Sequence, residues 1–220
     1  VQIIENAKDI GDGKNRLSKI AHSSSISMSL EKVKVFDQTS KHLNVNFEIN
    51  NLSSEDQILA LMKGNIDVGF IRPPVLNRLD ELYATTLYPE PLYVALHQNH
   101  ILASERSIKI QQLRHENFVS TPHAERGGLS YLVENLCLSA GFSPKKATVQ
   151  SRKVSQLQLV AAEIGICIVP EEFRHILPKQ VRLIALDAEN AWSDVVMVWS
   201  KNADGVIQRC TEYMIKQFQR

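Results

Sequence analysis

The chain has 220 residues, of which 44% are hydrophobic and 22% charged, and its formal net charge is +1. This composition is typical of a globular protein, and the length permits one large domain or two modest lobes. A net charge so close to zero argues against strong attraction of this stretch to nucleic acid or to an anionic membrane. The sequence shows neither an apolar run long enough to span a bilayer nor a visible signal peptide.

The number and spacing of the cysteines predict reduced thiols. Cys137, Cys167 and Cys210 are far apart in the sequence and odd in number, and no CxxC or Cys/His ligand spacing occurs. Each of the first two lies on an apolar segment, which favours burial in a cytoplasmic protein. The alternative, a redox sensor, requires an accessible thiolate beside a basic group.

The chain opens on Val1 in a segment that resembles the end of a helix, followed by a glycine-containing linker at 11–15. We therefore expect a piece of a longer protein. Beyond the linker, strand and helix patterns alternate, which is typical of an α/β fold. The elements predicted in chain order are a strand at 16–22, a helix at 26–40, a strand at 45–49, a helix at 54–63, strands at 66–71 and 92–96, a short helix at 110–113, a strand at 118–119, a helix at 129–140, a strand at 147–150, a helix from 155, strands at 166–169, 181–186 and 195–199, and a helix from 204.

Two segments, 54–71 and 155–170, share one pattern: a short helix, a turn and a short apolar strand. Ser54 and Ser155 each have a glutamine three residues later, which is the spacing of a capping box and predicts that each serine caps its helix. Free N–H groups and the positive end of the helix dipole favour an anion at such places. The pattern indicates two lobes that close on a small molecule.

Three blocks carry a family resemblance: ALMKGNIDVGF at 60–70, LVAAEIGICIVP at 159–170, and NHILA at 99–103 with the apolar pattern that follows at 110–118. Their order and spacing resemble those of the effector-binding domain of LysR-type transcriptional regulators, over about residues 15–217. The chain departs from the family pattern where Glu163 replaces a usual glycine and where Leu43 and Ile101 replace common prolines.

The resemblance implies an α/β fold with two Rossmann-like lobes of the periplasmic-binding-protein type 2, joined by two crossover strands near 89–93 and 189–195. Residues 1–14 would then be the end of a linker helix and a hinge. Regulatory lobe I would comprise 15–90 and 193–220, and regulatory lobe II would comprise 91–192. The resemblance also implies a homodimer or homotetramer that pairs through the helices at 30–40 and 129–140, and DNA binding only through a missing N-terminal winged helix-turn-helix.

Serines mark the expected effector site in lobe I. Ser24 and Ser25 precede one helix, and Ser53 and Ser54 begin the next at the carboxyl end of a strand, where open α/β sheets bind ligands. Hydroxyl and amide donors there suit a carboxylate, and the alternative is ordinary helix capping. By alignment with the family, Ser25 matches the effector-contacting loop best.

Arg72 follows a strand and precedes two prolines that restrict the loop. Its guanidinium could bind a carboxylate through two parallel hydrogen bonds. The alternative, which we favour, is a structural salt bridge, for example with Glu90.

In lobe II, Thr121, Pro122 and His123 follow a strand and should face the cleft by the same rule. Val169 would supply an apolar wall. Arg126 and Arg152 are alternative charge partners in this lobe, and the default interpretation of both is an ordinary surface arginine.

Catalytic motifs are missing from the sequence: it contains no GxSxG, HExxH, P-loop or GxGxxG. His97 and His100 have no evident third ligand, and Asp67 is expected to be structural, so we expect no enzyme, no metal and no cofactor. The function predicted is an effector-sensing domain of a LysR-type regulator that binds a small carboxylate between two lobes. The alternatives are a solute-binding protein of a transporter and an enzyme on the same fold.

Overall fold

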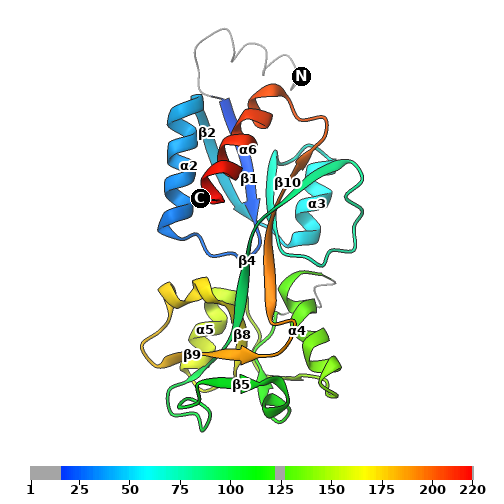
Figure 1. Ribbon diagram of the computed structural model, residues 1–220. Coiled ribbons are helices and arrows are strands. Elements are labelled where there is room, and N and C mark those ends of the chain that lie inside the picture. The colour runs from blue at the N-terminus through cyan, green and yellow to red at the C-terminus, as the bar shows by residue number, and fades with distance from the viewer. Residues whose placement is uncertain (1–15, 122–126, 220) are drawn as a thin grey trace.

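The computed structural model describes residues 16–121 and 127–219 (Figure 1). Its α-helices are α2 (Leu30–Leu43), α3 (Ser54–Met62), α4 (Gly128–Ser139), α5 (Lys153–Ala161) and α6 (Gly205–Phe218), with 3-10 helices η1 (Ile110–Leu113) and η2 (Glu171–Ile176). Its strands are β1 (Arg16–His22), β2 (Val45–Asn51), β3 (Val68–Ile71), β4 (Leu82–His97), β5 (Ser107–Lys109), β6 (Asn117–Phe118), β7 (Lys145–Lys146), β8 (Cys167–Pro170), β9 (Val181–Asp187) and β10 (Trp192–Ser200). Among these helices, none is long and apolar enough to cross a lipid bilayer.

Two long strands connect two halves of the molecule. β4 and β10 pair antiparallel along nearly the whole length of β10, and Figure 1 shows them running from one half to the other. We call the half with β1, α2, β2, α3, β3 and α6 lobe I, and the half with β5, α4, α5, β8 and β9 lobe II. The strand order is β2-β1-β3-β10-β4-β9-β5, with β8 paired to β4, so the sheet is continuous through the two connecting strands.

Each lobe has apolar clusters on both sides of its sheet. In lobe I, α2 and α6 pack on one face around Phe36 and Phe70, and α3 packs on the other through Ile58. In lobe II, α4 covers a cluster that contains Ile168, and α5 covers one that contains Val169. These neighbouring residues of β8 point to opposite faces because side chains alternate along a strand.

Most predicted elements are present. α3, η1, α4, β9 and α6 begin or end within a few residues of the prediction, and Asp204 caps α6 by accepting hydrogen bonds from two backbone N–H groups. Asp67 is structural, since its carboxylate accepts from the backbone N–H of Lys19 at 2.8 Å. The predicted helix tail and linker before residue 16 lie outside the described residues.

Both predicted capping boxes are wrong. Ser53, not Ser54, caps α3: its Oγ accepts the backbone N–H of Asp56 at 3.1 Å. α5 begins two residues before Ser155, after Arg152, whose side chain makes no capping hydrogen bond. In both helices the glutamine of the first turn reaches back instead, as Gln57 Nε2 donates to the backbone oxygen of the residue five positions earlier.

Three boundaries also differ from the prediction. The first helix begins at 30 rather than 26, because Ser29 caps it and the preceding serines form a turn. The strand expected at 147–150 is instead the two-residue β7 at 145–146. The first half of β4 was missed, since polar residues and two prolines at 89 and 91 hide its strand pattern.

Glu163 has a backbone φ of +58°, in the left-handed region that glycine adopts without strain. It lies in the turn between α5 and β8, at the position where the family resemblance expects glycine. We predict that Glu163→Gly raises the free energy of unfolding by about 1 kcal/mol. A side chain in this conformation costs about 1–2 kcal/mol, and the contact with His97 that is lost, made by a 65% exposed Glu163 side chain, contributes about 0–1 kcal/mol. Urea denaturation measures the change. Glu163→Ala is the control: it removes the same contact, keeps the Cβ and should give no gain.

Candidate functional site

The serine-rich loop after β1 is folded back on itself at the boundary between the lobes. The backbone N–H of Ser23 donates to the carbonyl of Phe70 at 3.2 Å, and the Ser23 and Ser25 hydroxyls are 2.8 Å apart. Both serines are buried, whereas Ser24 is partly exposed. Of the predicted loop residues, Ser24 is therefore the one placed to meet a ligand.

The start of α3 lies beside this loop. Ser53 is occupied as the helix cap, and its hydroxyl also donates to the Asp56 carboxylate at 2.7 Å. Ser54 is buried, and its Oγ accepts the backbone N–H of Arg72 at 3.2 Å. The predicted hydroxyls of α3 thus have structural partners inside lobe I.

Arg72 is fully buried, and all of its guanidinium nitrogens have partners. Nε donates to the carbonyl of Ser25 at 3.1 Å, Nη1 donates to the carbonyl of Ser193 at 3.1 Å, and Nη2 pairs with the carboxylate of Glu90. The contacts join the loop after β1 to both connecting strands. In this arrangement Arg72 fulfils the structural alternative, a salt bridge with Glu90.

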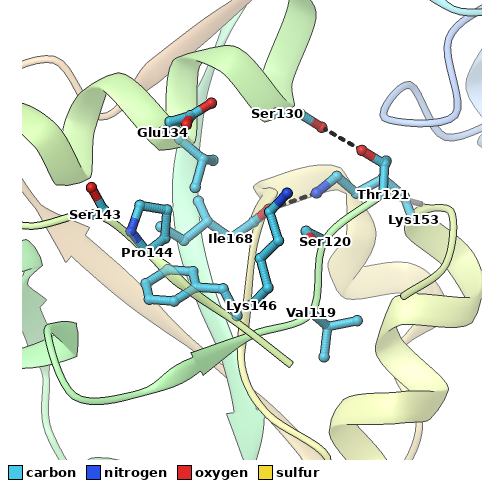
Figure 2. Close-up of a pocket in the computed structure, with 12 residues that line it drawn as sticks. Val119, Ser120, Thr121, Ser130, Glu134, Ser143, Pro144, Lys146, Lys153 and Ile168 are labelled. Atoms are coloured by element: carbon cyan, nitrogen blue, oxygen red, sulfur yellow. Dashed lines mark hydrogen bonds between the residues drawn. The ribbon is translucent and has the colours of Figure 1, made fainter. Parts of the chain in front are cut away.

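In lobe II, Thr121 is nearly buried, with its Oγ1 3.5 Å from the hydroxyl of Ser130 on α4. It lines a cavity within lobe II that Figure 2 shows. Pro122, His123 and Arg126 lie outside the described residues. Val169 is fully buried under α5 and packs in the core.

Two hydrogen bonds and one ion pair between described residues join the lobes outside the connecting strands. The backbone N–H of Gly128, at the start of α4, donates to the carbonyl of Pro74 at 2.7 Å. Arg152 Nη1 donates to Oδ1 of Asn51 at 3.0 Å. Lys32 of α2, almost fully buried, pairs with Glu172 of η2; burial lowers the pKa of Lys32, and Glu172 acts in the opposite direction.

A cavity of about 420 Å³, the inter-lobe cavity, lies between the lobes. Its lobe I wall includes His22, Ser24 and Asn51, and its lobe II wall includes Arg152 and Phe173. Burial lowers the pKa of His22, so its imidazole is predominantly neutral near pH 7. The cavity is therefore bounded by neutral polar groups, one guanidinium and apolar surface.

The start of α5 adds hydrogen-bond donors to this cavity. Val154 and Ser155, in its first turn, both line the wall. The side chain of the capping residue Arg152 makes no hydrogen bond to this turn. The backbone N–H groups of the turn therefore stay available to a ligand, at the positive end of the helix dipole. Sequence reasoning named Arg152 only as an alternative, and it missed His22, Asn51 and Phe173. No local pattern marks these residues, since the fold alone brings them together.

Comparison with known proteins identifies the family. The model described as the LysR substrate binding domain matches residues 37–219. The chain belongs to the LysR family. This is a family of transcriptional regulators and not of enzymes. Among the described residues of this LysR domain, no cluster of three His, Cys, Asp or Glu side chains is suited to a metal.

Curated relatives of this LysR domain include the transcriptional regulator AlsR of Bacillus subtilis, 27% identical over 91% of the chain and 66% of AlsR, and the Hca operon transcriptional activator HcaR of Escherichia coli, 28% identical over 70% of the chain and 51% of HcaR. The chain thus covers less than two thirds of the length of each relative. Among solved structures, the effector-binding domain of a BenM variant superimposes with a TM-score of 0.79 at 22% identity, covering 93% of this chain and 94% of the other. Full-length CbnR in complex with its target DNA gives 0.81 at 19% identity, covering all of this chain and 79% of CbnR. The fold is therefore that of LysR effector-binding domains, periplasmic-binding-protein-like type 2.

The cysteines of the LysR domain match the prediction of buried, reduced thiols, because all three are buried and unpaired. Burial raises the pKa of Cys137 to about 12 and those of Cys167 and Cys210 to about 11. We predict that the native protein reacts with a disulfide reagent at about pH 8 far more slowly than the protein in guanidinium, because the reactive species is the thiolate. Spectrophotometric thiol titration measures this. Rapid reaction of one thiol in the native state would contradict this prediction and support the redox-sensor alternative.

Proposed function

We propose that this chain is the effector-sensing domain of a LysR-type transcription factor and that a small carboxylate binds in the inter-lobe cavity. The observation that carries the proposal is the position of Arg152 and the first turn of α5, which face Ser24 across that cavity. A guanidinium, helix N–H groups and hydroxyls together suit a carboxylate. The volume lies at the small end of the range of about 300–1,000 Å³ typical of ligand pockets.

Control of transcription would follow from the two-lobed construction. A ligand that touches both lobes binds differently at different inter-lobe angles, and it shifts the population toward the angle that it prefers. We place lobe I at 15–90 with 193–220 and lobe II at 91–192. Cluster membership supports this division: on β4 it changes from the lobe I core at Leu87 to the lobe II core at Leu92.

Pairing with a second copy would pass the change on to DNA-binding domains. We propose a homodimer or homotetramer, formed in the bacterial cytoplasm, that contacts DNA only through an N-terminal winged helix-turn-helix. Exposed apolar side chains support pairing through α2 and α4: Leu30 and Val33 are 64% and 47% exposed, and Leu138 is 51% exposed.

Sedimentation analysis of Val33→Glu tests this pairing, and we expect the variant to form a weaker dimer than the unaltered chain. A variant dimer as stable as that of the unaltered chain would argue against the proposed interface.

The effector site is tested with Arg152→Gln. A thermal-shift screen of small mono- and dicarboxylates first finds the acid that stabilises the protein most, since binding to the native state raises the melting temperature. Titration calorimetry with that acid should then show at least about a tenfold loss of affinity in the variant, as expected for a lost charge-assisted contact. Arg114→Gln, an exposed arginine outside the cavity, is the matched control. Equal affinities in the two variants would contradict the site.

A further inference from the structure

The lobe II cavity, about 330 Å³, is a second cavity that the inter-lobe site does not use. It lies between α4, α5 and the ends of β6 and β7, and residues of lobe II form its described walls (Figure 2). β6 and β7 are parallel, and Val119, Ser120 and Thr121, which follow the carboxyl end of β6, line the cavity; α/β sheets bind ligands at such strand ends. Of the predicted site residues that the structure describes, Thr121 is the one that lines this cavity.

One part of the wall is apolar. Phe118, Val119 and Ile168 are each at most 4% exposed and form the inner surface, and Val133 and Pro144 continue it. Ile168 rather than Val169 faces the cavity, because neighbouring side chains of β8 point to opposite faces. This surface suits a short hydrocarbon body or a single ring.

The other part carries cationic and hydroxyl groups. Lys153 is 5% exposed, and its Nζ donates to Oε1 of Gln156 at 3.0 Å and to the carbonyl oxygen of Ile168 at 3.3 Å. Figure 2 shows the Lys146 side chain extending from β7 into the same cavity. Lys146 has no hydrogen-bond or ion-pair partner among the described residues.

The Ser120 hydroxyl is an independent observation that favours a ligand in this cavity. Its Oγ is a buried atom in the cavity wall and has no hydrogen-bond partner within the part of the chain that the structure describes. Burying a polar atom without a hydrogen-bond partner is unfavourable, so a ligand oxygen beside it is favoured. Among the described residues of the wall, Glu134 is the single carboxylate against two lysines, which gives this part of the lining one net positive charge.

We propose that the lobe II cavity binds a small monocarboxylate with an apolar body. Its carboxylate would lie among Lys146, Lys153 and Ser120, and its hydrocarbon part against Phe118 and Ile168. This site is separate from the inter-lobe site: Lys153 lines one cavity, whereas Arg152 and Val154, its neighbours in sequence, line the other.

Methyl NMR of the isoleucine-labelled chain tests the proposal, with sodium benzoate as the probe and benzamide as its uncharged counterpart. Ile168 reports on the lobe II cavity and Ile26 on the inter-lobe cavity. Benzoate up to about 10 mM, a range that covers weak millimolar binding, should shift the Ile168 methyl signal saturably, and benzamide should not.

Two neighbouring lysines provide the matched variants. Lys146→Gln should weaken the benzoate affinity read from Ile168 by at least about fivefold, whereas Lys145→Gln, exposed and outside the cavity wall, should change it less than twofold. Both residues are exposed, so neither variant should unfold the chain. The proposal is overturned by an unmoved Ile168 signal or by equal effects of the two variants. A shift of Ile26 alone would overturn it while leaving the inter-lobe effector site intact.

Discussion

Replacing Arg72 with methionine should lower the free energy of unfolding by about 3–5 kcal/mol, which is the usual cost of breaking a buried ion pair from one side. The substitution leaves the Glu90 carboxylate, 7% exposed, without its guanidinium partner. It also removes the donors to the carbonyl oxygens of Ser25 and Ser193. Urea denaturation followed by circular dichroism measures the loss.

Two further variants separate the buried pair from charge in general. Lys41→Met breaks an exposed pair with Asp37 on α2 and should cost at most about 1 kcal/mol. The double substitution of Arg72→Met with Glu90→Leu should recover part of the loss, because it leaves no unpaired charge in the interior. A single Arg72→Met variant as stable as the Lys41→Met variant would contradict the structural role that we assign to Arg72.

Gly165→Ala should destabilise the protein by about 2–5 kcal/mol, a sum of overpacking and broken backbone hydrogen bonding. A Cβ on Gly165 would overlap the backbone oxygen of Asn117. That oxygen accepts the N–H of Ile166 at 2.8 Å, and the Ile166 carbonyl in turn accepts the N–H of Val119 at 2.8 Å. The entry to β8 therefore depends on a close approach between two backbone segments.

Gly205→Ala provides the control for this substitution. Gly205 is the first residue of α6, and a Cβ there meets only the end of the flexible Arg209 side chain at 3.5 Å. This variant should be neutral or slightly stabilising, because alanine is the better helix former. Denaturation midpoints that fall equally in both glycine variants would show that the close approach at Gly165 does not carry the effect.

Sequence patterns predicted the fold because it depends on local periodicity. Alternation at Val45, Phe47 and Ile49 indicated β2, and the apolar spacing of Ile207, Cys210 and Met214 indicated the buried face of α6. They failed for the first half of β4, where polar residues and the prolines at 89 and 91 hide the strand pattern. The cap of α3 was assigned to the wrong residue because Ser53 and Ser54 are adjacent and both suit the role. Ser155 failed as a cap because α5 already begins at Lys153.

The site was less accessible to sequence reasoning. The sequence indicated two possible roles for Arg72. Its burial beside Glu90 depends on how the two connecting strands pack, which the sequence does not show. Lys153 and Ser120 face one cavity although they are far apart in sequence. Their juxtaposition depends on tertiary packing, which no spacing in the chain reveals.

The central claim is that an effector binds between the lobes and touches both. Its most direct test is a crystal structure with the carboxylate that gives the largest thermal shift. We expect density for the acid in contact with Ser24 of lobe I and Arg152 of lobe II, together with a change in the inter-lobe angle relative to the ligand-free crystal. An acid bound outside the inter-lobe cavity, with that cavity empty and the two lobes unmoved, would contradict the claim.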